Sequence, residues 1–91
     1  MLSDLAMVPD VVELEALPGR RLRLAFSDGL RGVVDIDEIV AEYVGVFAPL
    51  TSDEYFNQAR LDPELGTVVW PNGADLAPEA LHAAVAPSAP A

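Results

Sequence analysis

Hydrophobic and polar residues alternate along the first third of the chain. Over residues 11–17, apolar side chains alternate with two glutamates, which is the period-two pattern of a half-buried strand. The alternation returns over 21–26, and a third apolar run covers 30–36. Turn-forming Pro, Gly, Ser and Asp residues separate the three runs. The pattern predicts a three-stranded antiparallel meander over residues 11–36.

The register of the second hairpin can be predicted from the requirement that its apolar side chains share one face of the sheet. A slip of one residue would move every one of them to the opposite face. A three-residue loop ending at Gly29 places Phe26 opposite Leu30. A two-residue loop would place Phe26 beside Arg31. Asp28 and Gly29 should therefore form a structural turn, with Gly29 at positive φ. One face should then carry Val12, Leu14, Leu22, Leu24, Phe26, Leu30 and Val34.

The first hairpin turns at Pro18-Gly19, and the same reasoning pairs Leu14 with Leu22 and Val12 with Leu24. On the other face, acids would flank the arginine cluster of residues 20–23. The expected neighbours are Glu15 by Arg21, Glu13 by Arg23, and Asp35 on the other side of Arg21. Such pairs neutralise the cluster, so we do not expect a nucleic-acid-binding patch there.

Short helices should follow the meander. Asp35 and Glu38 have the spacing of a capping box, which predicts a helix that ends at Gly45. Its inward residues would be Ile39, Val40 and Tyr43. Thr51 and Glu54 form a second capping-box pair, which predicts a helix of about two turns.

The last third of the chain should hold a second hairpin and a helix. Residues 60–62 and 66–70 have strand character, a turn follows at 71–73, and Pro78 suits the first position of a helix ending near Val85. The expected fold class is therefore α+β: a three-stranded antiparallel meander followed by short helices, a second β-hairpin and a C-terminal helix.

The whole pattern predicts one domain over residues 1–86, followed by a disordered tail at 87–91 that has nothing to bury.

Composition narrows the function classes. The chain has no cysteine, so disulfides and thiolate metal sites are excluded. Its N-terminus lacks the features of a signal peptide, and no apolar run approaches the ~20 residues of a membrane span, so we expect a cytoplasmic protein. The net charge of −10, with no lysine, opposes binding to nucleic acid or to an anionic membrane and would attract a basic protein.

Few residues could carry chemistry. Asp35, Asp37 and Glu38 could form a hard-metal cluster, but helix capping explains the same residues. His82 is the only histidine, and its spacing from Glu79 indicates an exposed pair on the last helix. We therefore expect no catalytic residue, no metal site and no cofactor.

The most unusual segment contains Trp70, Asn72, Gly73 and Asp75. A tryptophan beside a polar turn can anchor an interface, which makes these four residues a candidate interaction surface. Alternatively, Trp70 covers a thin core while Asn72 and Asp75 bind the backbone of the turn.

Three stretches together resemble the DUF2442 family of small bacterial domains of unknown function. They are Leu22-Arg23-Leu24-Ala25-Phe26-Ser27-Asp28-Gly29, Gly45-Val46-Phe47-Ala48-Pro49-Leu50, and Thr67-Val68-Val69-Trp70-Pro71-Asn72-Gly73-Ala74-Asp75-Leu76. The resemblance covers about residues 7–84 and implies a meander, helices and a second hairpin. Some relatives carry a C-terminal helix-turn-helix, which this sequence lacks. Relatives are often encoded beside a second small protein, which suggests toxin–antitoxin pairs.

The leading hypothesis is a non-catalytic protein-interaction module, the antitoxin-like or regulatory half of a two-protein pair. Its partner would be a basic protein encoded by a neighbouring gene, or a second copy bound through a sheet edge or an apolar patch. One alternative is a DNA-linked transcriptional regulator component, which would need a helix-turn-helix or a basic surface. Another is a small ligand-binding domain or enzyme, for which a pocket ringed by Tyr43, Tyr55, Trp70 and acids would be the distinguishing feature.

Overall fold

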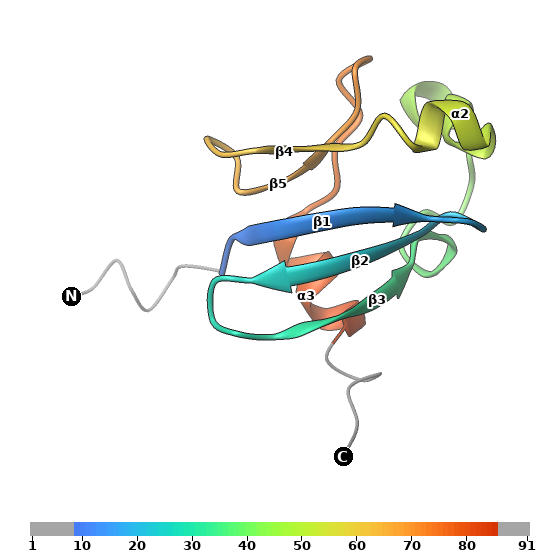
Figure 1. Ribbon diagram of the computed structural model, residues 1–91. Helices are drawn as coiled ribbons and strands as arrows, with labels where there is room; N and C mark the ends of the chain where they lie inside the picture. Colours follow the sequence, from blue (N-terminus) through green and yellow to red (C-terminus); the bar gives the residue numbers. More distant parts are fainter. Residues whose placement is uncertain (1–8, 86–91) are drawn as a thin grey trace.

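A computed structural model describes residues 9–85 of the chain. The strands β1 (Val11–Leu17), β2 (Arg21–Phe26) and β3 (Arg31–Asp35) form an antiparallel sheet in the order β1-β2-β3. The 3₁₀ helices η1 (Ile36–Glu38) and η2 (Gly45–Thr51), the short helix α2 (Asp53–Phe56), a hairpin of β4 (Arg60–Asp62) and β5 (Thr67–Val69), and helix α3 (Pro78–Val85) follow (Figure 1). This confirms the predicted α+β fold. The predicted tail at 87–91 lies outside the described residues.

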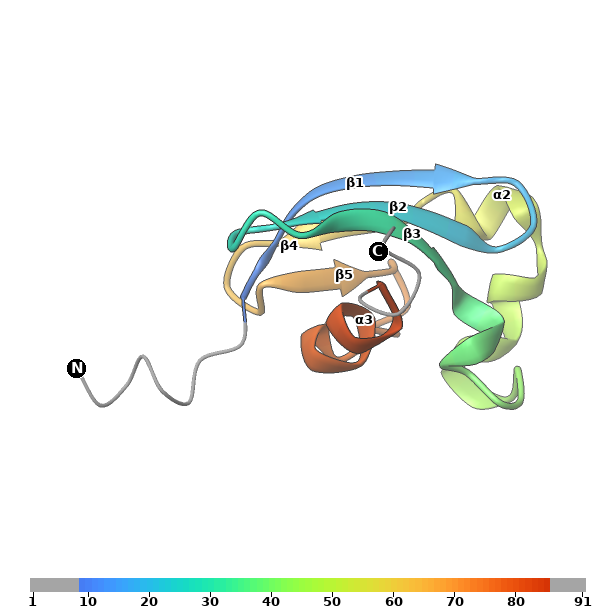
Figure 2. The ribbon, with the colours of Figure 1, turned by 90° about the horizontal axis from the view of Figure 1, so that it is seen from below.

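The core lies between the three-stranded sheet and α3. Figure 2 shows α3 on one side of the sheet, which we call the inner face. The β4–β5 hairpin runs alongside β1 (Figure 1), and the backbone N–H of Val11 donates to the carbonyl of Gly66 at 3.0 Å. The largest fully buried side chains are Trp70, Phe56, Leu22, Leu24, Ile36, Leu50 and Leu81. No helix within residues 9–85 has the length and apolar character that crossing a membrane requires.

The predicted register of the second hairpin is confirmed. Leu22 pairs with Val34 and Leu24 pairs with Gly32. The backbone N–H of Phe26 donates to the carbonyl of Leu30 at 2.8 Å. Gly29 closes the loop with φ of +94°, a conformation that costs glycine little because it has no Cβ.

The predicted register of the first hairpin is wrong by two residues. Leu14 pairs with Leu24 instead of Leu22, because the loop closes one residue later than Pro18-Gly19. Arg20 occupies the third loop position with φ of +57°, in the left-handed region that non-glycine residues rarely adopt. A shift of two residues keeps every side chain on its face.

The shifted register changes the neighbours on the outer side of the sheet. Glu15 lies opposite Arg23 rather than Arg21, and Glu13 lies opposite Ala25 rather than Arg23. The expected pairing of Arg21 with Asp35 is confirmed.

Val12 was predicted to face the core, and this prediction is wrong. A β-bulge between Val11 and Glu13 turns Val11 inward beside Phe26, where it is 5% exposed. Val12 is consequently 50% exposed. A bulge inserts one extra residue, so the alternation of faces changes phase there, and the sequence pattern alone does not reveal it.

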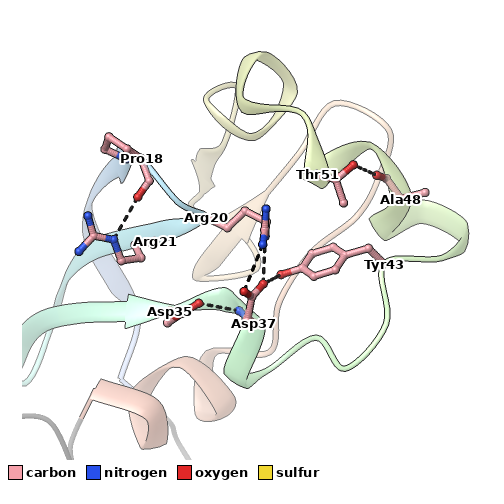
Figure 3. A network of polar contacts seen from close by, with 8 residues as sticks. All are labelled: Pro18, Arg20, Arg21, Asp35, Asp37, Tyr43, Ala48 and Thr51. Carbon is pink, nitrogen blue, oxygen red and sulfur yellow. Dashed lines mark hydrogen bonds and ion pairs between the residues drawn. The ribbon is translucent and has the colours of Figure 1, made fainter.

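The two helices predicted after the meander are shorter than expected. Asp35 does cap, since its carboxylate accepts from the N–H of Asp37, but only the single turn of η1 follows. Gly45 begins η2 instead of ending a helix. The cap of α2 is Ser52 rather than Thr51, whose hydroxyl donates to the carbonyl of Ala48 within η2 (Figure 3).

The second half otherwise follows the prediction. β4 and α3 have the expected bounds, and β5 lies within the expected strand 66–70. Gly73 closes the turn after β5 with φ of +93°.

Candidate functional site

The side of the sheet opposite α3 carries the main cluster of charged side chains, and we call it the outer face. It consists of Glu13, Glu15, Leu17, Arg21, Arg23, Ala25, Arg31, Val33 and Asp35. Every second residue of a strand points to the same side, which is why three short strands present nine side chains here. Six of them are exposed to solvent: Glu13, Glu15, Arg21, Arg23, Arg31 and Val33.

Ion pairs connect neighbouring strands on the outer face. Arg23 contacts Glu15 across β1 and β2. A guanidinium nitrogen of Arg31 lies 2.7 Å from a carboxylate oxygen of Glu13. That pair reaches from β3 to β1 across Ala25, which is only 2% exposed although it lies on the outer face. The charges therefore cover the small apolar centre of this face.

The outer face borders a hollow of about 840 Å³, which we call the trough. It is lined by Val12, Glu13, Leu14, Glu15, Arg23, Leu24, Arg31, Gly32, Val33, Ala59, Arg60 and Leu61. Ala59 immediately precedes β4, and Arg60 and Leu61 are its first two residues, so the hairpin beside β1 closes one side of the trough. Within residues 9–85 no carboxylate lies in ion-pair contact with Arg60.

Charge is unevenly distributed over the molecule. The outer face and the trough together contain four of the five arginines, balanced by Glu13, Glu15 and Asp35. The other described residues contain one arginine and eleven carboxylates. The outer side is thus close to neutral on an otherwise strongly acidic protein.

A second polar cluster consists of Arg20, Asp37 and Tyr43, and we call it the polar clip. It joins the β1–β2 loop to the segment after β3 (Figure 3). Arg20 donates to both carboxylate oxygens of Asp37, at 2.9 and 3.2 Å, and its guanidinium lies 5.2 Å from the centre of the Tyr43 ring. The Tyr43 hydroxyl donates to the same carboxylate at 2.5 Å. These contacts hold the pKa of Asp37 below its ordinary value, chiefly through the hydrogen bond from Arg20.

Two of the three acids of the candidate metal cluster, Asp35 and Asp37, make hydrogen bonds within the protein. Asp35 accepts from the N–H of Asp37 at 3.0 Å, and Asp37 is occupied by Arg20 and Tyr43. In the described part of the chain, no group of three or more histidine or acidic residues is placed to hold a metal ion.

The candidate surface at Trp70, Asn72, Gly73 and Asp75 divides between core and surface. Trp70 is 1% exposed, and its indole N–H donates to the carbonyl of Phe56 at 3.0 Å. The ring fills the core beside Phe56, as expected if Trp70 covers the core instead of anchoring an interface. Asn72, Gly73 and Asp75 are exposed, and their contact with a partner stays a prediction.

Asn72 holds the turn in the way expected of a structural residue. Its side-chain oxygen accepts from the N–H of Ala74 at 3.0 Å, and its amide donates to the carbonyl of Val46 at 2.9 Å. Its backbone N–H donates to the hydroxyl of Tyr55 at 2.8 Å. Neither Tyr43, Tyr55 nor Trp70 lines the trough, so the aromatic pocket expected of a small ligand-binding domain or enzyme is not formed there.

His82 does not pair with Glu79 as predicted. Its Nε2 lies 2.9 Å from a carboxylate oxygen of Asp28, and its ring packs edge-on against Phe26 at 4.9 Å between centroids. Asp28 also accepts from the N–H of Leu30. The backbone hydrogen bond, followed by the histidine, lowers the pKa of Asp28. The turn at Asp28 and Gly29 therefore also anchors α3.

The sequence offered only a partial signal for the outer face. The alternation of Arg21 and Arg23 with leucines places both on one side of β2, and Arg31 and Val33 follow from the confirmed register of β3. Arg60 stands 29 residues after Arg31, and nothing in the local pattern links the two. Only the position of the β4–β5 hairpin beside β1 brings Arg60 to the trough.

Comparison with known proteins identifies one family. Residues 11–87 match the model of DUF2442, described as a protein of unknown function. No curated protein and no solved structure matches the chain.

Proposed function

The chain belongs to the DUF2442 family, and from this premise we propose that it is a non-catalytic interaction module that binds a protein partner through the trough and the outer face. The proposal retains the hypothesis that the protein acts as the antitoxin-like or regulatory half of a pair. It assigns the binding role to the outer side of the sheet rather than to Trp70.

The observation that carries the proposal is the gathering of arginines around an open hollow on an acidic protein. Arg60 has a guanidinium without a carboxylate partner in the described residues, and Val12 and Val33 supply exposed apolar contacts beside it. Arginine is among the side chains that contribute most to binding at interfaces, and the contacts around such a residue exclude water from it. A folded partner that presents a carboxylate together with apolar side chains would satisfy this surface.

The rest of the molecule favours a partner that is basic overall. Among the described residues outside the outer face and trough, eleven carboxylates stand against one arginine, and this excess would attract a basic protein from a distance. The trough would then select a partner segment at short range. A long-range field increases the association rate, whereas buried contacts mainly set the dissociation rate.

Partner capture with matched variants tests the proposal. The wild-type protein is purified from its native cells, and co-eluting proteins are identified by mass spectrometry. The same is done with Arg23→Ala plus Arg60→Ala, which should lose the partner or reduce its recovery about tenfold or more. Because this variant also lowers the net charge by two, the control is Ala41→Glu plus Ala83→Glu. Both alanines are exposed and lie away from the trough.

Two results would contradict the proposal. Equal recovery by the wild type and the arginine variant would show that the trough does not bind the partner. Equal loss in the arginine variant and in its charge-matched control would assign the effect to net charge alone. Circular dichroism of each variant establishes that all of them fold.

A further inference from the structure

The sheet has two edges, and they are protected to different degrees. The β1 edge has the β4–β5 hairpin alongside it and is bonded to it through Val11 and Gly66. The β3 edge has no such neighbour among the described residues. Helix α3 packs beneath β3 rather than beside it, because Val85 lies directly under Gly32 on the inner face.

The direction of the β3 backbone groups follows from the bonds to β2. Phe26 donates to the carbonyl of Leu30, and Ile36 donates to the carbonyl of Arg20, so even-numbered residues of this segment pair with β2. In an antiparallel pair, alternate residues direct their N–H and C=O groups to opposite sides. Arg31, Val33 and Asp35 therefore direct theirs outward. No backbone partner for Arg31 or Val33 at this edge occurs within residues 9–85.

We propose that β3 pairs with β3 of a second copy of this chain, antiparallel and centred on Val33. In this register the two Val33 residues face each other across the two-fold axis. Arg31 of one copy lies opposite Asp35 of the other, and the same contact is repeated on the opposite side of the axis. The backbone groups of all three residues point outward, so they can form hydrogen bonds between the copies in this register. The pairing of opposite charges favours the same register.

Other registers lack this complementarity. An antiparallel pairing centred on Arg31 places two arginines face to face, and a pairing centred on Asp35 does the same with two carboxylates. Like charges directly opposite each other are destabilising. The edge also lacks the usual barriers to strand addition: β3 contains neither proline nor lysine, and no bulge interrupts its pairing with β2.

Arg31 and Asp35 both have polar atoms that could make the contacts between the two copies. The Arg31 side chain is 65% exposed, and its contact with Glu13 uses only one of its terminal nitrogens. One carboxylate oxygen of Asp35 accepts from Asp37, and the other has no partner among the described residues. The pairing would join two outer faces into one continuous six-stranded surface.

Disulfide trapping tests the pairing directly, because the natural chain has no cysteine. Opposed residues in a hydrogen-bonded antiparallel pair have Cα atoms about 5.5 Å apart, within the range that a disulfide spans. Val33→Cys should therefore form a covalent dimer under mild oxidation. Val12→Cys is the control, since Val12 is also exposed but lies on β1, where it should remain largely unlinked.

Charge reversal provides the second test, on the purified protein by sedimentation velocity over a concentration series. The wild type should show a weak, concentration-dependent dimer, because the edge is only five residues long. Arg31→Asp should weaken dimerisation about tenfold by placing it opposite Asp35. The double variant Arg31→Asp plus Asp35→Arg should restore it, because opposite charges again face each other.

A wild-type protein that stays monomeric at about millimolar concentration would overturn the pairing. So would equal cross-linking of Val33→Cys and Val12→Cys. Asp35→Arg removes the cap of η1, so a double variant that fails to fold leaves the decision to disulfide trapping and Arg31→Asp. The pairing is measured without any partner protein, so its failure is distinguishable from a failure of partner capture at the trough.

Discussion

Arg20 concentrates several unusual properties in one residue. It is the only non-glycine residue with positive φ in the described part of the chain. Its carbonyl accepts from the N–H of Ile36, and its guanidinium donates hydrogen bonds to both carboxylate oxygens of Asp37. A strained backbone conformation persists only where surrounding contacts hold it in place. The polar clip provides such contacts, because it ties the β1–β2 loop to the segment after β3.

The hydroxyl of Tyr43 reports on the polar clip. Burial, followed by the hydrogen bond to Asp37, raises the pKa of Tyr43 from 10.0 to about 12. Above pH 10 the unfolded chain loses this proton while the folded protein keeps it. The contribution of the neutral phenol to stability is therefore complete below pH 10 and is lost as the pH rises through about 12.

We expect the free energy of unfolding of the wild type to fall more steeply between pH 10 and about 12 than that of Tyr43→Phe. Denaturant titrations at a series of pH values measure this difference. Ultraviolet absorbance of tyrosinate gives the pKa independently. Parallel alkaline slopes for the two proteins would show that the phenol does not titrate abnormally.

At the scale of elements, the contact between β3 and α3 depends on one glycine. A Cβ built on Gly32 would lie 2.8 Å from Cγ1 of Val85, closer than side-chain atoms pack. Valine is stiff at χ1, so it cannot rotate away cheaply. The absence of a side chain at Gly32 is what allows the last turn of α3 to rest against the sheet.

Gly32→Ala should therefore destabilise the fold by about 1–3 kcal/mol through overpacking. In a Val85→Ala background the same substitution should cost much less, because the space is already open. Urea unfolding of the four proteins in this double-mutant cycle gives the coupling energy, expected at about 1 kcal/mol or more. Strictly additive effects would mean that helix and strand adjust independently.

The strand pattern could be predicted from the sequence because alternation and turn residues agree over residues 21–35. The loop ending at Gly29 also determined the register, since glycine is the residue that enters the left-handed region without penalty. The first hairpin could not be predicted in the same way. Its register depends on Arg20 adopting that conformation, which no propensity favours, and on a bulge at Val11 that alternation does not reveal.

The short helices could not be predicted because capping residues mark where a helix begins and say little about its length. Asp35 caps η1, yet the chain leaves the helix after one turn, and Tyr43 is drawn to Asp37. Local sequence patterns were also insufficient to locate the candidate sites, as Trp70 and the trough show. The indole is buried and the trough is built from β1, β2, β3 and β4 together, so both depend on how distant segments pack.

For the whole molecule, salt should distinguish the two proposed associations. Each chain carries a net charge of −10, so two copies repel at long range although the β3 edge is balanced. The Debye length shortens from about 30 Å at 0.01 M to about 8 Å at 0.15 M ionic strength. Self-association should therefore strengthen as salt is added over this range.

Binding to a basic partner should show the opposite trend, with slower association and lower affinity as salt rises. Sedimentation of the pure protein and titration with the captured partner, both across the same salt series, provide the comparison. Dimerisation that weakens steadily with salt would contradict the balance of charges described for the β3 edge.

The uneven placement of charge also gives the molecule a polarity. Four of the five arginines lie on the outer face and trough, whereas eleven of the described carboxylates lie elsewhere, so the molecule has an electric dipole as well as a net charge. An approaching partner of mixed charge would experience a torque before contact, which turns its carboxylate-bearing side toward the arginines and its basic side toward the remainder. Misoriented encounters would then be rejected early, and the small domain would gain selectivity from its long-range field before any side chain in the trough is touched.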